Sequence, residues 1–355
     1  MALPHWSVAG APLGGPTAMV IAVDESSRVG EVRRAAAALG RAAGLDEGEV
    51  GSLAIVATEI ATNLALHATG GRVLLRAVGE PGAGGVELLA LDAGPGIPNV
   101  ARSLEDGYST AGTAGKGLGA IRRMADEFDL HSRVKEPAAG TALVVRLRSA
   151  RARQAAAAEV AAGALRVGVV CVPVAGETAC GDAWTVLRDG ARSLVVLADG
   201  LGHGPDAALA AAEAVRVVRE HADAAPATLV QLAHQALRAT RGAALAIAAL
   251  EPARGTLTFA GVGNVAASVQ TPGAVRSLAS HNGTVGHAMR TVQEFRHDWR
   301  AGAALVLHTD GINTRWRLDA YPGVLQRDPA LLAGLLFRDS ARGRDDATVL
   351  VVREP

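Results

Sequence analysis

Three apolar runs in this chain each end in an aspartate that is followed by glycine, either directly or after one alanine. They read VELLALDAG, SLVVLADG and ALVLHTDG, and their aspartates are Asp92, Asp199 and Asp310. Short apolar runs bounded by glycine are typical of strands in the interior of a sheet. A single Asp-Gly pair after a strand is most often a turn, but its recurrence predicts carboxylates at the ends of several strands.

The chain divides near residue 150. Its 355 residues are enough for two domains that each bury a core. The segment SARARQAAAAEVAAGA is rich in alanine and arginine and has little to bury, which predicts a linker helix. We therefore expect one domain at residues 1–148, a linker at 149–164 and a second domain at 165–355.

Both halves mix helices with strands, so the expected fold class is α/β (α+β) with two domains. Before the linker, apolar periodicity predicts helices at Arg28–Ala43, Glu47–Thr69 and Gly117–Glu127, and strands at Met19–Val23, Arg72–Val78, Val86–Leu91, Phe128–Ser132 and Thr141–Leu147. After the linker it predicts helices at Asp206–His221 and Ala227–Thr240, and strands at Arg166–Val172, Ser193–Ala198, Ala244–Leu250, Thr256–Ala260, Ala303–His308 and Thr348–Val352.

The composition excludes several classes of protein. The 35 basic and 35 acidic side chains give a net charge of +0, which argues against a chain that coats nucleic acid or an anionic membrane. No stretch reaches the ~18 consecutive apolar residues of a membrane span, and the first residues do not read as a secretion signal. Two cysteines, Cys171 and Cys180, cannot form a disulfide framework or a Cys-rich zinc site. We expect a soluble, cytoplasmic protein.

The first half carries a candidate nucleotide site. Glu59 and Asn63 lie four residues apart, so a helix places them on one face, where they could serve as a base and as a ligand for Mg²⁺. That pair alone is more typical of a polar stripe facing solvent. Two glycine clusters follow, LDAGPGIPN and GTAGKGLGAIRRM, and glycine turns that open a helix offer amide donors to phosphate. The second cluster is neither a Walker A loop nor a dinucleotide fingerprint.

The combination ExxxN, DxGxG, GKGLG and Gly140-Thr141 resembles the GHKL, or Bergerat-fold, family of ATPases and kinases. The words GIPN, GYST and DEFD are similar to the RsbT type, small serine kinases that switch bacterial stress-response complexes. The resemblance covers most of residues 20–147 and implies a Bergerat α/β sandwich that binds ATP with Mg²⁺. It implies that Glu59 activates the attacking hydroxyl and that Asn63 binds Mg²⁺. The other nucleotide-binding residues it implies are Asp92 at the adenine amino group, Thr141 in support, and Gly94, Gly96, Gly115, Gly117 and Gly119.

The second half contains four short motifs with aspartates, CGDAW, LADGLGHG, HTDGI and GRDDATVL. Carboxylates that converge cannot all stay ionised without cations between them, and oxygen-only ligands favour Mg²⁺ or Mn²⁺ over zinc. Two such ions can deprotonate a bridging water that then attacks a phosphate in line. His203, beside Asp199, is at least as typical of an exposed loop as of a phosphate contact.

These words resemble the metal-dependent PP2C phosphatases of the SpoIIE-like bacterial branch, and ETACGDAW is similar to the RsbX type. The resemblance covers residues 165–355 and implies a PP2C-like α/β/β/α sandwich with two Mn²⁺ or Mg²⁺ ions. By this resemblance Asp199 bridges both metals, Gly200 offers its carbonyl, Asp310 and Asp345 complete one metal's shell, and Asp182 lies near the other. The role of Asp346 stays open, and INTRWRLDAYPG departs from the family pattern.

Together the resemblances imply a bifunctional regulator. The first domain phosphorylates a serine or threonine of a STAS-domain partner, and the second removes that kind of phosphate. Two alternatives stay open. In one, the first domain only holds nucleotide and sequesters a partner, as related anti-sigma factors do. In the other, it regulates the phosphatase within the chain. Glu59 favours the kinase, because a nucleotide-dependent clamp needs no base.

Overall fold

The computed structural model describes residues 7–8, 17–105, 117–134 and 138–355. The chain forms two compact units. The N-terminal unit comprises Ala18–Ala164 and Arg317–Asp339, and the C-terminal unit contains Leu165–Trp316 and Ser340–Pro355, with Ser7–Val8 from the start of the chain. This division differs from the expected one, because residues 317–339 fold with the N-terminal unit rather than with the residues on either side of them.

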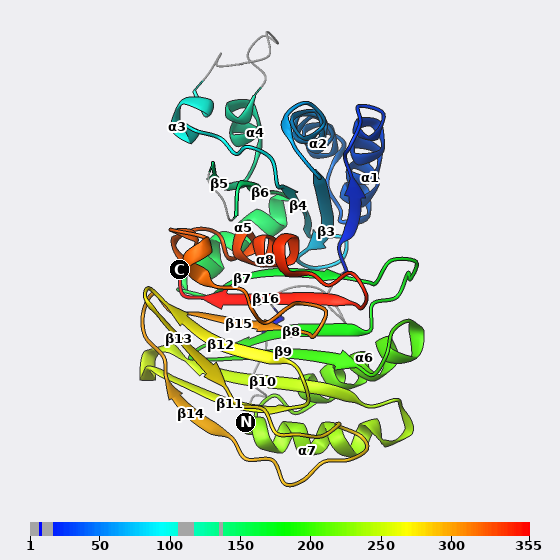
Figure 1. The fold of residues 1–355 in the computed structure, drawn as a ribbon, viewed down its shortest axis with the longest axis vertical. Coiled ribbons are helices and arrows are strands. Elements are labelled where there is room, and N and C mark those ends of the chain that lie inside the picture. Colours follow the sequence, from blue (N-terminus) through cyan, green and yellow to red (C-terminus); the bar gives the residue numbers. More distant parts are fainter. Residues whose placement is uncertain (1–6, 9–16, 106–116, 135–137) are drawn as a thin grey trace. The chain divides into compact units, whose positions relative to one another are not determined.

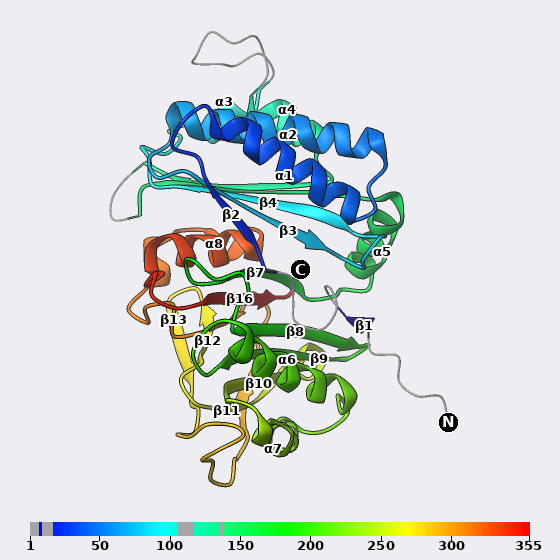
Figure 2. The ribbon, with the colours of Figure 1, turned by 90° about the vertical axis from the view of Figure 1, so that its right-hand side faces the viewer.

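The N-terminal unit is built on a five-stranded antiparallel sheet. Its strands, in spatial order, are β2 (Met19–Ala22), β3 (Arg72–Val78), β4 (Gly85–Asp92), β6 (Gly140–Arg148) and β5 (Glu127–Arg133). Two helices, α1 (Arg28–Ala42) and α2 (Glu47–His67), cover one face of this sheet, as Figure 2 shows. Apolar residues from both helices and all five strands pack into one core between them.

Short helices complete this unit. They are α3 (Val100–Ser103), α4 (Leu118–Met124) and α5 (Ala150–Ala161). The predicted linker is therefore helical, and α5 belongs to the N-terminal unit. Ser149 caps its first turn, and Arg153 makes ion pairs with Glu49 at 2.7 Å and with Asp126 at 3.4 Å. These contacts attach a helix that has almost no apolar face of its own.

The longest helix, α2, begins with a capping box at Asp46. The Asp46 carboxylate accepts a hydrogen bond from the Glu49 amide at 2.8 Å, and the Glu49 carboxylate accepts one from the Asp46 amide at 2.9 Å. By length and composition, α2 would be apolar enough to cross a membrane, with a mean hydropathy of 1.3. Its buried residues, which include Leu53 and Ile60, lie in the core of the N-terminal unit and account for that apolar character.

The capping box gives a first prediction. We expect Asp46→Ala to lower the unfolding free energy of the N-terminal unit by about 1 kcal/mol, because two amides lose their partners at the helix start. Urea denaturation of the full chain, followed by circular dichroism, measures this loss. The matched control is Glu47→Ala, in the same turn, whose side chain is 83% exposed. Equal losses in the two variants would contradict the capping role.

Segment 317–339 lies on the face of the N-terminal sheet opposite α1 and α2 (Figure 2). It consists of η3 (Leu318–Ala320), η4 (Val324–Gln326) and α8 (Pro329–Ser340) up to its penultimate residue. Gly334 of α8 lies so close to Leu89 and Leu91 of β4 that an added Cβ would be 2.9 Å from each side chain. The small residue therefore lets the helix approach the strand.

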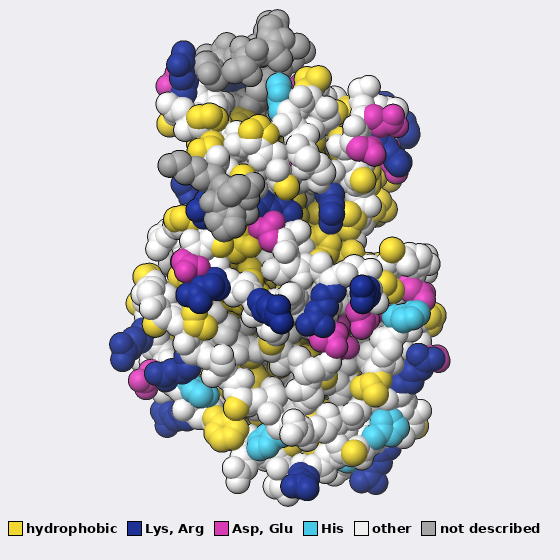
Figure 3. Space-filling model, viewed as in Figure 1, with side chains coloured by type: hydrophobic (Ala, Val, Ile, Leu, Met, Phe, Trp, Pro, Cys, Tyr) yellow, Lys and Arg dark blue, Asp and Glu magenta, His cyan; other side chains and the backbone are white. Residues whose placement is uncertain are grey.

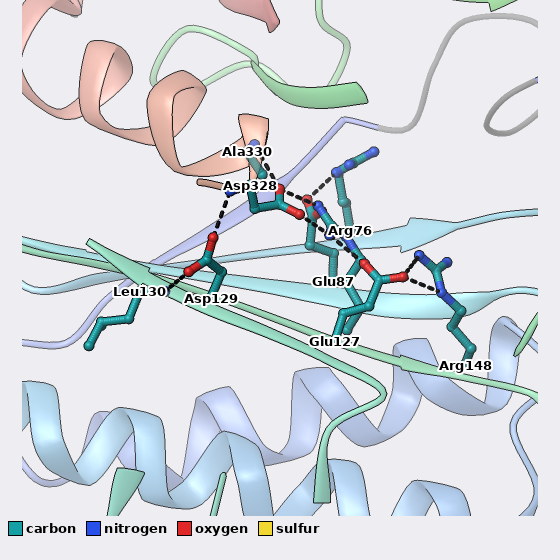
Figure 4. A network of polar contacts seen from close by, with 9 residues as sticks. Arg76, Glu87, Glu127, Asp129, Leu130, Arg148, Asp328 and Ala330 are labelled. Carbon is teal, nitrogen blue, oxygen red and sulfur yellow. Dashed lines mark hydrogen bonds and ion pairs between the residues drawn. The ribbon is translucent and has the colours of Figure 1, made fainter. Parts of the chain in front are cut away.

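A buried charge network joins segment 317–339 to this sheet (Figure 4). Arg146 pairs with Asp328 at 2.7 Å, with Glu87 at 2.6 Å and with Glu127 at 2.6 Å. Glu87 also accepts a hydrogen bond from Arg76 at 2.6 Å. Burial alone would raise the pKa of Glu87, but the charges of Arg76 and Arg146 hold that pKa below its usual value. The network is therefore ionised and depends on its arginines.

Removing Arg146 should be costly. We expect Arg146→Leu to lower the unfolding free energy of the N-terminal unit by about 3 kcal/mol, because Glu87 and Asp328 stay buried without a shared cation. The same urea denaturation measures the loss. Arg151→Leu is the control, since Arg151 is 75% exposed and its ion pair with Glu80 lies at the surface. A loss below 1 kcal/mol for Arg146→Leu would show that the network does not stabilise the unit.

The C-terminal unit is a sandwich of two antiparallel sheets (Figure 1). The first has the order β1 (Ser7–Val8), β8 (Asp182–Asp189), β9 (Arg192–Gly200), β10 (Ala243–Glu251), β11 (Thr256–Val262) and β14 (Phe295–Asp298). The second has the order β13 (Ala274–Leu278), β12 (Ala266–Thr271), β15 (Ala304–His308), β16 (Ala347–Arg353) and β7 (Arg166–Val172). Helices α6 (Pro205–Glu220) and α7 (Pro226–Ala236) pack on the outer face of the first sheet.

Strand β9 shows why the central strands of this unit are continuously apolar. Val195 and Leu197 point into the core between the two sheets, whereas Leu194 and Val196 point into the core beneath α6 and α7. A strand buried on both faces has no polar side to show. The mixed α/β, two-domain fold class is confirmed, although α8, the last long helix of this half of the sequence, folds with the N-terminal unit.

Charged side chains of both signs are interspersed on the face shown in Figure 3. On α6, Arg216 makes ion pairs with Glu213 and Glu220. Such exposed pairs add little stability, but the opposite charges neutralise each other locally at the surface.

Candidate nucleotide and metal sites

In the N-terminal unit, the candidate base and metal ligand lie on α2. Glu59 and Asn63 are one helical turn apart, and both are half-buried. Helix α2 ends at His67, and the Ala93 amide donates a hydrogen bond to the Thr69 carbonyl at 2.9 Å. The end of β4 therefore lies beside the C-terminal end of α2, on the side of the unit to which the predicted nucleotide residues belong.

Asp92, the last residue of β4, is held from several directions. It lies opposite Thr141 of β6, and its Oδ1 accepts a hydrogen bond from the Gly94 amide at 2.7 Å. Burial raises the pKa of Asp92, and the Gly94 amide, the charge of Arg338 and the Thr141 amide oppose that rise. A carboxylate fixed in this way can accept a hydrogen bond from an amino group of a bound base.

At two glycines of this region an added side chain would clash with the backbone of a neighbouring segment. Gly96 has a φ of +71°, and a Cβ there would lie 2.2 Å from the Arg133 carbonyl oxygen. Gly140 has a φ of +123°, and a Cβ there would lie 2.1 Å from the Asp92 carbonyl oxygen. Glycine is therefore required at both positions by the protein's own backbone.

The remaining predicted glycines surround the start of α4. Gly117 is the residue before this helix, and Gly119 is buried within its first turn. Gly115 lies outside the described residues. The structure thus brings Asp92, Gly94 and Thr141 together, and it puts Glu59 and Asn63 on the neighbouring helix.

In the C-terminal unit, the predicted carboxylates gather around Asp199. Asp182 at the start of β8 lies opposite Asp199 near the end of β9. Burial and the nearby charges of Asp310, Asp345 and Asp346 together raise the pKa of Asp199 to about 7, while a hydrogen bond from the Asp310 amide opposes the rise. Five carboxylates from four separate segments therefore influence one another at this end of the sandwich.

Thr309 is a contact that the sequence analysis missed. Asp182 is buried, its Oδ2 accepts a hydrogen bond from Thr309 Oγ1 at 2.9 Å, and burial and Asp199 raise its pKa. Thr309 in turn accepts a hydrogen bond from the Thr348 amide at 3.0 Å. The one feature of the sequence that could have indicated Thr309 is its position directly before Asp310. Thr309 orients Asp182 toward the other carboxylates.

Asn264 is a second missed contact. Its Nδ2 donates a hydrogen bond to Asp310 Oδ2 at 2.7 Å. Asn264 sits in the turn between β11 and β12, and nothing in the sequence around it resembles a ligand motif. The turn brings it to Asp310 only through the pairing of the strands.

The structure separates the roles of the two neighbouring aspartates at the end of the chain. Asp346 accepts hydrogen bonds from the Val174 amide at 2.7 Å and from the Gly181 amide at 2.6 Å. Asp345 Oδ1 accepts one from the Asp346 amide at 2.9 Å. Asp346 therefore fixes the loop that precedes Asp182, which answers the question that its sequence position left open.

The donor set suits a hard divalent cation. It consists of carboxylates, with no nitrogen or sulfur ligand among them, and burial together with the neighbouring carboxylates raises the pKa of Asp199. Within the described part of the chain, no three His, Cys, Asp or Glu side chains are close enough together to hold one metal ion. The predicted ligands thus share one region without forming a closed ligand set.

The histidine and the thiols near this region have other partners. His203 is 58% exposed and lies 2.8 Å from Glu177. Cys171 and Cys180 are buried, with their sulfur atoms 3.7 Å apart. A buried cysteine of this kind packs as a small apolar side chain.

Comparison with known families matches two different models to the two parts of the sequence. Residues 22–148 match the family model of the histidine kinase-like ATPase domain, and residues 189–355 match that of stage II sporulation protein E (SpoIIE). The chain joins an ATPase-like domain to a SpoIIE domain. The SpoIIE match includes Asp199, Asp310 and Asp345 but begins after Asp182.

Individual relatives support both assignments. The ATPase-like half contains 75 residues that are 41% identical to the serine/threonine-protein kinase RsbT of Bacillus subtilis (strain 168), covering 21% of this chain and 56% of the kinase. The SpoIIE half is similar to the phosphoserine phosphatase RsbX of the same strain, at 25% identity over 139 residues, which cover 39% of this chain and 70% of that protein. The chain therefore spans little more than half the length of the first of these relatives.

One solved structure is also similar. It is described as "The bacterial stressosome: a modular system that has been adapted to control secondary messenger signaling", with a TM-score of 0.51 and 28% identity over 53% of this chain and 99% of that one. These relatives confirm the resemblances to an RsbT-type kinase and an RsbX-type phosphatase.

Proposed function

We propose that this chain is a bifunctional regulator that sets the phosphorylation of a STAS-domain protein in bacterial stress signalling. The ATPase-like domain transfers phosphate from ATP to a serine or threonine of the partner, and the SpoIIE domain removes it. Two observations support the proposal. Asp92 meets Gly94 and Thr141 at the end of β4, and Asp182 lies opposite Asp199, on which the charges of Asp310 and Asp345 act.

For the transfer, Glu59 accepts the proton of the attacking hydroxyl group. Asn63 would hold Mg²⁺, whose charge would neutralise the phosphates of ATP. Asp92 accepts a hydrogen bond from the adenine amino group, and the Thr141 amide supports the carboxylate. Phosphoryl transfer needs positioning and charge more than covalent chemistry from the protein, so these groups suffice.

For the hydrolysis, Asp182, Asp199, Asp310, Asp345 and the Gly200 carbonyl would hold two Mn²⁺ or Mg²⁺ ions. These ions would supply an activated water and stabilise the charge that develops on the phosphate. Thr309 orients Asp182, Asn264 orients Asp310, and Asp346 fixes the loop before Asp182. Such supporting contacts are worth about 10–100-fold in metal affinity or activity.

The partner is inferred from the relatives. One is named a serine/threonine-protein kinase, one a phosphoserine phosphatase, and one solved structure concerns the stressosome. A partner from a stress-signalling pathway with a STAS domain, in the cytoplasm, fits all three.

Two assays test the proposal on the purified full chain. Single-turnover ADP formation should depend on a STAS-domain partner from the same cell, identified by pull-down. Phosphate release from a phosphoserine peptide should require Mn²⁺ or Mg²⁺ and stop with a chelator. Binding of ATP without partner-dependent ADP formation would instead make the ATPase-like domain a nucleotide-dependent binding module, with the phosphatase as the only enzyme.

A further inference from the structure

Segment 317–339 belongs to the SpoIIE match by sequence and to the N-terminal unit by structure. The match to the ATPase domain ends at residue 148, so this segment is an addition to that domain. Its contacts reach the end of β4 where the nucleotide residues gather. Arg338, on the last turn of α8, donates a hydrogen bond through Nη1 to the Asp92 carbonyl oxygen at 2.6 Å.

The Arg338 guanidinium is held in a fixed orientation. Its side chain is 6% exposed, and it forms a two-pronged pair with Asp339, at 2.6 Å from Nε and 2.8 Å from Nη2. Asp339 also accepts a hydrogen bond from the hydroxyl of the buried Tyr321 at 2.9 Å. Paired arginine–carboxylate contacts of this kind restrict direction as well as distance. The remaining nitrogen of the guanidinium, Nη1, therefore points toward the Asp92 carbonyl oxygen.

The surroundings of this contact are tightly packed. A Cβ at Gly140 would lie 2.7 Å from Arg338 Nη1 and 2.1 Å from the Asp92 carbonyl oxygen. Gly140 directly precedes Thr141, the residue opposite Asp92. Arg338, Gly140 and Asp92 thus meet in one place, where a side chain larger than that of glycine would not fit at position 140. The charge of Arg338 also opposes the effect of burial on the Asp92 carboxylate.

We propose that Arg338 is a positioning residue of the nucleotide site. It fixes the backbone of Asp92, so that the carboxylate is presented as an acceptor to the amino group of adenine. The inference rests on the proposed ATP binding. The base-recognition residue of the ATPase-like domain is then held by Arg338, which lies 246 residues after Asp92 in the sequence.

The test measures the affinity of the full chain for ATP and for GTP in the presence of Mg²⁺, by calorimetry. GTP carries a carbonyl where adenine carries its amino group, so a well-positioned Asp92 favours ATP. We expect Arg338→Met to weaken ATP binding about tenfold and to reduce the preference for ATP over GTP, since a charge-assisted hydrogen bond is lost. Arg338→Lys should recover part of both.

Two further variants separate positioning from folding. Tyr321→Phe removes only the hydroxyl that holds Asp339, and we expect a smaller loss of ATP preference in a folded chain. Arg327→Met is the matched control, because Arg327 lies in the same segment, is 53% exposed and pairs with Asp129. It should leave both affinities unchanged.

The outcomes are distinct. If the unaltered chain prefers ATP and neither Arg338→Met nor Tyr321→Phe changes that preference, Arg338 does not position Asp92 and the inference is wrong. A uniform loss of both nucleotides in the Arg338 variants, with the preference intact, would also overturn it, because only the stability of the fold would then depend on Arg338. If the unaltered chain binds no ATP, the proposed function itself fails and the inference with it.

Discussion

Asp199→Asn is expected to lower the rate of phosphate release from a phosphoserine peptide by about a thousandfold, with saturating Mn²⁺. Asp199 is the carboxylate on which the charges of Asp310, Asp345 and Asp346 act, and it lies opposite Asp182. An amide of the same shape keeps one oxygen but loses the negative charge that would bridge two cations. Release of inorganic phosphate over time measures the change.

The control for this variant is Asp206→Asn. Asp206 lies in the first turn of α6, and its side chain is 67% exposed in an ion pair with Arg241. Its replacement should change the rate by less than about twofold. If Asp199→Asn retained more than a tenth of the activity while Asp206→Asn was unaffected, Asp199 would not be the bridging ligand.

Glu59→Gln is expected to slow partner-dependent ADP formation by about 10²–10⁴-fold and to leave ATP affinity nearly unchanged. The substitution removes the group that accepts the hydroxyl proton and preserves the size of the side chain on the half-buried face of α2. Single-turnover ADP formation and calorimetric ATP binding, measured on the same preparation, separate the two effects.

Glu47→Gln is the matched control on α2, because Glu47 is 83% exposed in the first turn of the helix. It should behave as the unaltered chain does in both assays. Unchanged ADP formation in Glu59→Gln would exclude Glu59 as the base. A parallel loss of ATP affinity would show that Glu59 acts in binding instead.

The sequence allowed most regular elements to be predicted, because their patterns are local. The strand predicted at Arg166–Val172 is β7 with the same bounds, and the helix predicted at Glu47–Thr69 is α2, two residues shorter. The start of α2 is marked by its capping box, and β9 is marked by a continuous run of apolar residues. Such signals need no knowledge of distant partners.

Elements that depend on distant partners were not predicted. Strand β8 mixes polar and apolar residues, DAWTVLRD, and becomes a strand by pairing with β9 on one side and β1 on the other. Helix α8 is apolar on most of its surface, so its sequence does not say which unit it joins. The buried pair of Arg146 and Asp328 decides that, and it joins residues 182 positions apart.

The same contrast holds for the candidate sites. Asp199 and Asp310 stand in recurring words at strand ends, and the structure brings their carboxylates within electrostatic reach of each other. Asn264, Thr309 and Arg338 do not belong to any such motif. Each acts through a contact that forms only after the sheets have paired. Residues that bind can be found from motifs, whereas those that orient them emerge from the fold.

The central claim is that one chain both adds and removes phosphate on the same kind of partner. A time course of label incorporation tests it most directly, with the full chain, its STAS-domain partner, Mg²⁺, Mn²⁺ and radiolabelled ATP. We predict that label on the partner rises and then decays with the unaltered chain, accumulates and persists with Asp199→Asn, and never appears with Glu59→Gln. The same label on the partner with all three proteins would contradict the claim.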